Sequence, residues 1–232
     1  MLKSFKRLGQ LLCLTSLTLM LIPTVSYAKE IPIYSVPTDE KVVALTFDIS
    51  WGEHVALPVL DALALKFVDK ATFFLSGPWS DKHPEVVQEI ARRGYEIASH
   101  GWHHYNYSQY SDDWIREQVT KTEQTLEQII GHKPSRLIRT PNGDYNTRVV
   151  RTLRNMGYEV IQWDTDSLDW KKPGVEQVAA RVLERVHPGD IILMHASDSC
   201  PDTPEALLTI LEALQMEGYR FVTVSELLKY QK

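Results

Sequence analysis

Apolar runs alternate with segments of helical periodicity along residues 41–232. Short apolar or β-branched runs predict buried strands, and apolar positions repeating every three or four residues predict helices packed against them. Glycines 94, 157 and 218 stand between a helical segment and a strand, where helices commonly end. The predicted strands are Val42–Phe47, Ala71–Leu75, Glu96–Ser99, Leu137–Arg139, Glu159–Gln162, Asp190–Met194 and Arg220–Val224. The predicted helices are Val55–Lys66, Pro84–Arg93, Ser111–Ile130, Asn146–Met156, Val175–Arg185 and Glu205–Glu217, with a short final helix capped by Ser225.

This alternation predicts an α/β fold with a parallel sheet, because each parallel pair of strands needs a crossover. Two architectures fit the pattern, a doubly wound open sheet and a (β/α) barrel. The glycine-rich signature of a dinucleotide-binding fold follows none of the predicted strands. Polar side chains, among them Asp48, His100, Arg139 and His195, follow several strands instead. Because the carboxyl ends of barrel strands converge on one face, this placement favours the barrel.

The N-terminal 28 residues differ from the rest of the chain. Three basic residues lie within positions 3–7, an uncharged stretch covers 11–21, and Ser26-x-Ala28 ends the segment. This pattern predicts a secretory signal peptide cleaved before Lys29. An uncleaved membrane anchor is the alternative, although the apolar stretch is short for a bilayer span. We therefore expect an exported protein with a short lead at 29–40, a single domain at 41–232 and no stable membrane span in the mature form.

Charge and cysteine content narrow the classes of partner. Cleavage would change the formal net charge from −5 to −8, because residues 1–28 hold three basic residues and no acid. This balance argues against binding to nucleic acid or to an anionic membrane. Cys200 would be the only remaining thiol, so an intrachain disulfide is excluded. No basic cluster flanks Cys200, and a spectator thiol is the better interpretation than a nucleophile.

Two histidines follow the third predicted strand. His100 and His104 are four residues apart, which would place both imidazoles on one face of a helical turn and point His103 elsewhere. A polar loop whose histidines bond to the backbone is the alternative. Two histidines are a weak zinc site, because zinc normally takes three protein ligands and a water. The third ligand should come from another strand end, near Asp48.

Further candidate residues follow the later strands. After the fourth strand, Arg139 could hold a carboxylate through two N–H groups, and the turn at 141–143 could present backbone N–H groups to a pocket. A turn with a solvated arginine is the alternative. The segment 163–170 gathers three carboxylates and two indoles, which indicates an aromatic-walled pocket of the kind that binds sugars. His195, after an apolar strand, is either a core residue or a general acid tuned by a carboxylate.

Five motifs occur in one order: Thr46-Phe47-Asp48, His100-x-x-x-His104, Arg139-x-Pro141-x-Gly143, Asp166-x-x-Asp169-Trp170 and Leu193-x-His195. Together they resemble the motifs of the polysaccharide deacetylases (carbohydrate esterase family 4, the NodB homology domain). The resemblance covers roughly residues 40–228 and implies a distorted (β/α)7 barrel. The longer strings at 45–52 and 195–199 look like the sporulation-associated PdaB-type subgroup. This likeness implies a spore-forming bacterium and a cell-wall or spore-cortex glycan as partner.

The resemblance also implies a reaction and roles for individual residues. The reaction is hydrolysis of an N-acetyl group on a GlcNAc- or MurNAc-containing glycan. The implied roles are general base for Asp48, metal ligands for His100 and His104, orientation of Asp48 for Arg139, general acid for His195 and tuning of that acid for Asp169. The implied substrate-binding residues are Asn142, Gly143, Trp163, Asp166, Trp170 and Leu193.

One departure from the family pattern bears on the cofactor. Metal-dependent members carry a second Asp after the catalytic one, and here Ile49 occupies that position, so a zinc or similar divalent site loses a ligand. Glu53 and Asp144 are the nearest alternative carboxylates in the sequence and are the candidates to replace it. Three functions remain open: a deacetylase with little or no metal dependence, a glycan-binding pseudoenzyme, and a glycosidase using two of Asp48, Asp164, Asp166 and Asp169.

Overall fold

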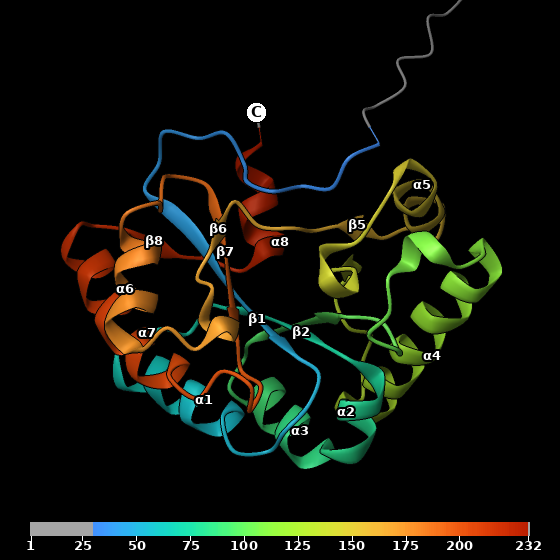
Figure 1. Ribbon diagram of the computed structural model, residues 1–232, viewed down its shortest axis with the longest axis horizontal. Helices are drawn as coiled ribbons and strands as arrows, with labels where there is room; N and C mark the ends of the chain where they lie inside the picture. Colours follow the sequence, from blue (N-terminus) through green and yellow to red (C-terminus); the bar gives the residue numbers. More distant parts are fainter. Residues whose placement is uncertain (1–29, 232) are drawn as a thin grey trace, which may run out of the picture.

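The computed structural model describes residues 30–231 as a curled parallel sheet with helices on its outer side (Figure 1). The predicted signal peptide lies outside the described residues. Within 30–231, no helix combines the length and apolarity needed to cross a bilayer. The strands are β1 (Val42–Ile49), β2 (Thr72–Leu75), β3 (Glu96–Ser99), β4 (Leu137–Ile138), β5 (Glu159–Val160), β6 (Thr165–Asp166), β7 (Asp190–His195) and β8 (Arg220–Phe221). The α-helices are α1 (Ala56–Leu65), α2 (Gly77–Lys82), α3 (Pro84–Arg92), α4 (Asp112–Ile130), α5 (Thr147–Asn155), α6 (Val175–Leu183), α7 (Thr203–Met216) and α8 (Val224–Leu227).

The strand order β5-β4-β3-β2-β1-β7-β6 confirms the predicted distorted barrel. Every ladder is parallel, with β8 paired to the start of β1. Three details differ from the prediction. The two-residue strand β6 beside β7 and the short helix α2 were missed, because neither is long enough to show a hydrophobic period. The last predicted strand became β8, which lies off the main strand path.

The N-terminal lead links β5, at one end of this curled sheet, to β7. The backbone N–H of Ile33 donates to the carbonyl of Val160 in β5, and the N–H of Gln162 donates back to Ile33. Three residues later, the N–H of Val36 donates to Gly189 at the start of β7. The lead therefore joins strand edges that no ladder joins directly among the described residues.

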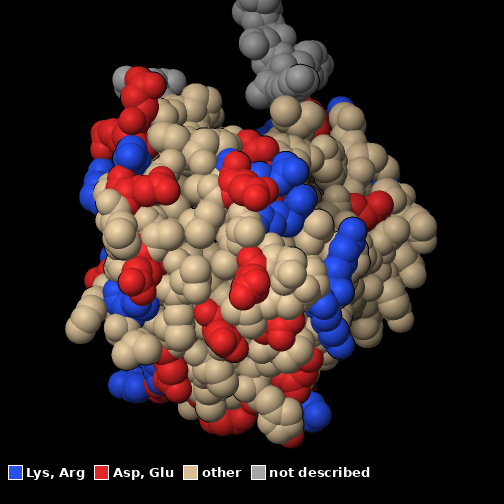
Figure 2. Space-filling view, turned by 60° about the vertical axis from the view of Figure 1, so that its left-hand side comes forward, with Lys and Arg blue, Asp and Glu red and all other residues tan. Residues whose placement is uncertain are grey.

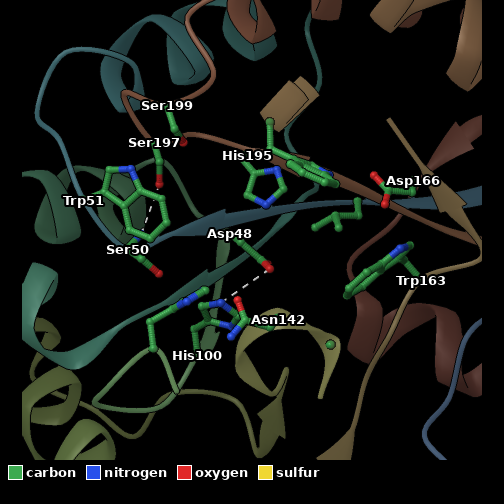
Figure 3. Close-up of a pocket in the computed structure, with 14 residues that line it drawn as sticks. Asp48, Ser50, Trp51, His100, Asn142, Trp163, Asp166, His195, Ser197 and Ser199 are labelled. Atoms are coloured by element: carbon green, nitrogen blue, oxygen red, sulfur yellow. Dashed lines mark hydrogen bonds and ion pairs between the residues drawn. The ribbon is translucent and has the colours of Figure 1, made fainter. Parts of the chain in front are cut away.

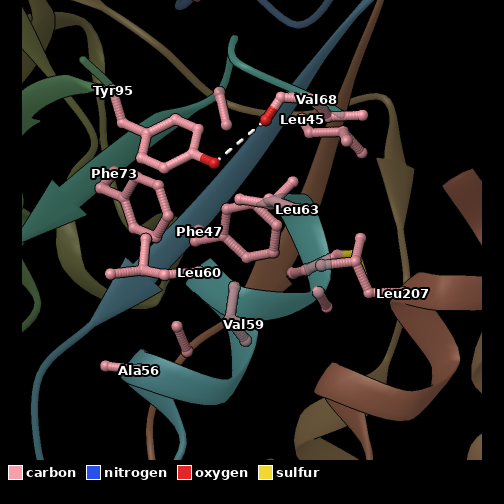
Figure 4. Packing of buried hydrophobic residues seen from close by; sticks show 14 of the residues in the cluster. Leu45, Phe47, Ala56, Val59, Leu60, Leu63, Val68, Phe73, Tyr95 and Leu207 are labelled. Atoms are coloured by element: carbon pink, nitrogen blue, oxygen red, sulfur yellow. Dashed lines mark hydrogen bonds between the residues drawn. The ribbon is translucent and has the colours of Figure 1, made fainter. Parts of the chain in front are cut away.

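Alternation along β1 separates the core from the site. Side chains of successive strand residues point to opposite faces. Four alternate residues of β1 pack against α1 and α7 in the main apolar core: Val43, Leu45, Phe47 and Ile49 (Figure 4). Thr46 and Asp48 instead point to the inside of the curl, where Phe74 also lies. A fully apolar outer face thus fixes the register that turns Asp48 inward.

Local signals placed most helix ends correctly. Ser111 caps α4 by accepting a hydrogen bond from the Trp114 N–H, and Gly131 ends that helix with a positive φ of 78°. The cap predicted for Ser225 is wrong. Thr223 caps α8 instead, in a reciprocal pair with Glu226 that satisfies two backbone N–H groups.

Acidic and basic side chains are interspersed over the face of the molecule shown in Figure 2. Among the described residues, several acidic and basic side chains are paired at close range, for example Lys66 with Glu212 at 2.6 Å and Arg220 with Glu40 at 2.7 Å. Exposed pairs of this kind stabilise a fold only slightly. The fold is therefore held mainly by its apolar core.

Candidate active site

A cavity of about 430 Å³ lies at the carboxyl ends of the strands (Figure 3). It brings together most of the residues that the five motifs supply. Those lining it are Asp48, His100, His104, Asn142, Gly143, Trp163, Asp166, Trp170, Leu193 and His195. Arg139 and Asp169 are almost completely buried and contact the lining residues from behind. The sequence pattern therefore identified the pocket wall and two residues that support it.

Asp48 and His195 are direct neighbours across the β1–β7 ladder. Aligned residues on adjacent parallel strands point to the same face, and adjacent strands lie about 4.8 Å apart. Register alone therefore places a carboxylate and an imidazole side by side at the cavity. Asp48 is 5% exposed, whereas His195 is partly open to the cavity.

Arg139 fixes the position of Asp48 from inside the curl. One terminal nitrogen of its fully buried guanidinium donates to Asp48 Oδ1 at 2.8 Å and to the Thr46 hydroxyl at 2.8 Å. The other donates to the carbonyl of Gln162, so the predicted two-pronged grip on the carboxylate is wrong. The guanidinium plane lies over the ring of Phe74, 4.3 Å from its centroid. Burial is the largest single influence and would raise the pKa of Asp48. The charges of Arg139, His100 and His195, together with the Arg139 hydrogen bond, outweigh burial, so the pKa lies below its ordinary value.

Asp169 holds His195 in one orientation. Its Oδ1 lies 2.7 Å from His195 Nδ1, and its Oδ2 accepts from the His195 backbone N–H and the Thr203 hydroxyl, each at 2.7 Å. Since the carboxylate only accepts, Nδ1 carries the proton and Nε2 is the ring's other nitrogen. Burial works against the charged imidazole, but the Asp169 hydrogen bond and a Cys200 contact raise the pKa of His195 well above its ordinary value.

Left-handed backbone surrounds Asp169. Leu168 has φ 55° and Lys172 has φ 55°, and the single 3₁₀ turn Asp169–Lys171 lies between them. Non-glycine residues with positive φ are uncommon and are held by their surroundings. The turn lets the Trp170 N–H also donate to Asp169 Oδ1, at 2.8 Å. Several hydrogen bonds therefore fix the Asp169 carboxylate in the position where it contacts His195.

The histidine pair lies in a loop after β3, so the predicted helical turn is wrong. Its rings nevertheless approach each other, with centroids 5.2 Å apart, and His103 stacks away from them on Tyr105. His100 Nδ1 lies 2.8 Å from the carbonyl of Arg139 and must be the donor, because a carbonyl only accepts. Burial lowers the pKa of His100 to about 4 and also lowers the pKa of His104. Both rings are therefore neutral at physiological pH.

These residues do not complete the metal site that the family resemblance implies. Ile49 is fully buried in the apolar core, on a strand position opposite in direction to Asp48. Asp144 accepts two hydrogen bonds from Ser108, and Glu53 is exposed, so neither supplies the missing ligand at the cavity. Across residues 30–231, no set of three close-spaced ligand atoms from His, Cys, Asp or Glu includes the histidine pair. A three-ligand zinc site does not fit this donor set.

The turn after β4 forms one side of the cavity. Asn142 has a left-handed φ of 59°, and its side-chain amide donates to Asn106. The N–H groups of Gly143 and Asp144 close the turn on the carbonyls of Thr140 and Pro141. A Cβ on Gly143 would lie 2.8 Å from the Trp163 ring, so only glycine lets the turn approach this indole. Among the described residues, the Asn142 N–H is the amide of this turn without a hydrogen bond.

The acid-rich segment after β5 divides into two parts. Trp163, Asp166 and Trp170 line the cavity, where Trp170 is half exposed. Asp164 points elsewhere and pairs with His187 Nε2 at 3.0 Å. Because Asp169 already accepts four hydrogen bonds, the geometry does not favour a glycosidase built on these carboxylates.

The sequence pattern did not indicate that the loop joining β1 to α1 belongs to the site. Trp51 from this loop lines the cavity and contacts His104 edge-on, with centroids 5.5 Å apart. Asp198 holds the loop by accepting hydrogen bonds from the backbone N–H groups of residues 53, 54 and 55. Ser50, Ser197 and Ser199 also line the cavity. The signal available in the sequence was a tryptophan next to Gly52, directly after the first predicted strand. A single sequence, however, does not show which tryptophans face a pocket.

The fold and the site define a half-barrel α/β protein with a carboxylate and an imidazole aligned at the carboxyl ends of its strands. The sequence profile described as polysaccharide deacetylase matches residues 35–161. A peptidoglycan-N-acetylglucosamine deacetylase of Bacillus cereus is 35% identical over 201 residues, which cover 85% of this chain and 93% of that protein. The uncharacterized protein YlxY of Bacillus subtilis is 34% identical over 197 residues. These cover 85% of this chain but only 60% of YlxY.

Solved structures of carbohydrate esterase family 4 are also similar to this chain. BA3943 of Bacillus anthracis, described as a pseudoenzyme of the CE4 family, superposes with a TM-score of 0.80 at 33% identity. The match covers 87% of this chain and 70% of that chain. A BA3943 mutant with restored enzymatic activity matches with the same TM-score at 34% identity, over 87% of this chain and 72% of that one. The chain belongs to the polysaccharide deacetylase family, carbohydrate esterase family 4, a family of hydrolases that act on C–N bonds, as its motifs predicted.

Proposed function

We propose that this chain removes N-acetyl groups from GlcNAc- or MurNAc-containing polysaccharide by general acid–base catalysis that needs no resident metal. The observation that carries the proposal is the alignment of Asp48 with His195 on adjacent strands, each held by its own buried partner. The carboxylate is kept ionised and the imidazole is kept protonated, which is the division of labour that amide hydrolysis requires.

A water molecule is activated between Asp48 and His100. Asp48 Oδ2 and His100 Nε2 lie 3.7 Å apart, and both are acceptors once Nδ1 of His100 donates to a carbonyl. A water about 2.8 Å from each atom spans this separation and donates one hydrogen to each. Its lone pairs then face the cavity, and Asp48 takes the proton as the water attacks the acetyl carbonyl.

Two further groups that line the cavity act on the oxyanion and on the leaving nitrogen. The Asn142 N–H stabilises the oxyanion of the tetrahedral intermediate, as a backbone donor fixed before the reaction begins. His195 donates its Nε2 proton to the nitrogen as the C–N bond breaks, which releases acetate and a free amine. Asp169 stabilises the imidazolium before this step and keeps Nε2 in position.

The walls of the cavity suit a sugar ring. Trp51, Trp163 and Trp170 each contribute an indole to the lining. Such surfaces stack on the apolar faces of pyranose rings, and Asp166 adds an acceptor for a hydroxyl group. The name of the Bacillus cereus relative supports peptidoglycan as the polymer.

The proposed setting is outside the cytoplasm. The signal-like pattern of residues 1–28 supports export to the cell wall or to the space between the forespore membranes. The PdaB-like strings at 45–52 and 195–199 support a role in sporulation, with spore cortex as the glycan.

Acetate release tests the reaction directly. The wild type and Asp48→Asn are incubated with N-acetylated peptidoglycan and with chitooligosaccharides, in EDTA and in added zinc. We expect acetate in EDTA from the wild type and at least about 10²-fold less from the variant, as for loss of a general base. No acetate above background from the wild type in any condition would overturn the proposal.

A glycan-binding pseudoenzyme is the second candidate. The loss of the third metal ligand at Ile49 and the similarity to BA3943 favour it. It predicts saturable binding of the same glycans without acetate, and equal binding by the wild type and Asp48→Asn. New reducing ends without acetate would instead indicate a glycosidase.

A further inference from the structure

Asp169, His195 and Cys200 form a second cluster of ligand-type side chains behind the cavity wall. Each offers one ligand atom, and these atoms all lie within 4.8 Å of one another. Across residues 30–231 this is the only such group of three from His, Cys, Asp and Glu. A carboxylate, an imidazole and a thiolate are three of the ligand types that zinc takes in proteins.

We propose that this cluster is a binding site for a thiophilic divalent cation such as zinc, and that the bound cation inhibits the enzyme. The cation would bind the ring nitrogen that His195 now directs at Asp169, and so would dismantle the pair that keeps His195 protonated. Metal would thus act on this chain in the opposite sense to the metal of its metal-dependent relatives. The inhibition rests on the proposed function, but the binding does not.

The His195 ring must shift for a cation to bind. Ligand atoms around tetrahedral zinc are about 3.3–3.8 Å apart, given bonds of roughly 2.0–2.3 Å. His195 Nδ1 and Asp169 Oδ1 are 2.7 Å apart, so the ring must move back by roughly 0.6 Å. His195 is the partly exposed member of the cluster and lines the cavity, into which the ring can move.

The surroundings of Asp169 would support the cation. Three donors would stay in place when the Nδ1 proton leaves, namely the backbone N–H groups of Trp170 and His195 and the hydroxyl of Thr203. Hydrogen bonds of this kind orient a ligating carboxylate. Cys200 is fully buried, and a hydrogen-bond contact of 3.4 Å joins its sulfur to the Ser199 hydroxyl.

The exchange of protons is defined. The cation would replace the Nδ1 proton of His195 and the Sγ proton of Cys200. Binding therefore releases at least the thiol proton, and the affinity for the cation rises with pH. A site built on His100 and His104 has no thiol proton to release.

Cobalt spectroscopy of the full chain tests the site. Chelator-treated protein is titrated with Co²⁺, and a thiolate-to-cobalt charge-transfer band reports bonding to sulfur; Zn²⁺ competition then gives the zinc affinity. We expect one cation per chain with the thiolate band in the wild type and in the control His104→Ala. In Cys200→Ser the band should vanish and zinc affinity should fall at least about 100-fold, since even outer-shell changes lower affinity 10–100-fold.

Other outcomes overturn the site. A wild type without the thiolate band, or zinc binding that His104→Ala abolishes and Cys200→Ser leaves intact, would contradict it. If Cys200→Ser does not fold, ¹¹³Cd resonance of the wild type reads sulfur ligation directly, and a shift typical of oxygen and nitrogen ligands alone overturns the proposal.

Inhibition is read in a separate experiment. Zinc should inhibit acetate release by the wild type, and the inhibitory concentration should rise at least tenfold in Cys200→Ser. Equal inhibition of the two proteins contradicts the inhibitory role. Failure to release acetate at all would count against the proposed reaction and leave the cobalt result standing.

Discussion

His100 Nε2 and Asp48 Oδ2 face each other at 3.7 Å with no proton of their own between them. Arg139 contributes to this arrangement in two ways. Its carbonyl accepts a hydrogen bond from His100 Nδ1, and its guanidinium donates a hydrogen bond to Asp48. Two acceptors at this separation bind a donor molecule rather than each other. The family resemblance implies that such a histidine is a metal ligand, whereas in the proposed reaction His100 would be a second acceptor for the reacting water.

Loss of this second acceptor should slow the reaction without abolishing it. We expect His100→Ala to lower kcat about 10–10²-fold, less than Asp48→Asn, because the base remains while the water loses its orientation. Acetate release from a defined chitooligosaccharide provides the measurement. His103→Ala is the matched control, since His103 is exposed and stacks on Tyr105 outside the cavity. Equal rates for the wild type and His100→Ala would remove His100 from the reaction.

The pH dependence of kcat/KM should be broad. Activity should fall on the acid side as pH drops through about 4, where His100 takes up a proton on Nε2, while the lowered pKa of Asp48 keeps the base ionised. On the alkaline side it should persist well above neutrality, because Asp169 raises the pKa of His195. Acetate release measured across the pH range gives both limbs.

The variant Asp169→Asn distinguishes an effect of Asp169 on the pKa of His195 from a purely structural role of Asp169. Without the carboxylate, His195 loses its proton at lower pH, so the alkaline limb should move toward neutrality while the acid limb stays in place. An alkaline limb near the ordinary histidine value in the wild type would contradict the proposed acid.

Arg139 should matter for stability as well as for catalysis. Arg139→Leu leaves the buried Asp48 carboxylate without its partner, and breaking a buried pair in this way typically destabilises by about 3–5 kcal/mol. Urea unfolding measures the change. Arg220→Leu is the control, because its pair with Glu40 is exposed and should contribute little. Similar unfolding midpoints for both variants would mean that Asp48 is solvated and not held by Arg139.

Two glycines with nearly equal φ angles should differ in how much stability is lost when each is replaced by alanine. Gly52 has φ 88° and Gly94 has φ 82°. A Cβ on Gly52 would lie 2.2 Å from the Asp198 carboxyl carbon, whereas one on Gly94 meets no atom within 4 Å. Gly94→Ala should lose about 1–2 kcal/mol from the positive φ alone.

Gly52→Ala should lose more stability than Gly94→Ala and should also raise KM for long glycans, because the displaced loop carries Trp51. Thermal unfolding and glycan kinetics of the two variants provide the comparison. If Gly52→Ala matches Gly94→Ala in both, Asp198 does not hold the loop in this position.

Much of the fold was predictable because its signals are local. The apolar run of β1, the cap at Ser111 and the closing glycines each act within a few residues, so the sequence shows them directly. The missed β6 is two residues long and exists only because β7 offers it a partner. The loop conformation around His100 and His104 likewise depends on neighbouring strands, because the His100 N–H donates to Leu75 of β2 and the Arg139 N–H, directly after β4, donates to Ser99.

The sequence by itself determined the alternation of strands and helices, the polar residues at the strand ends, and the substitution of Ile49 for a metal ligand. These follow from residue type and period, which no tertiary contact alters. Only the tertiary structure decided that Arg139 grips Asp48 with one nitrogen, that Asp164 turns away to His187, and that Cys200 lies against His195. Each of these depends on side chains that are far apart in the chain and meet only when parallel strands align in register, and register is set by the whole buried face.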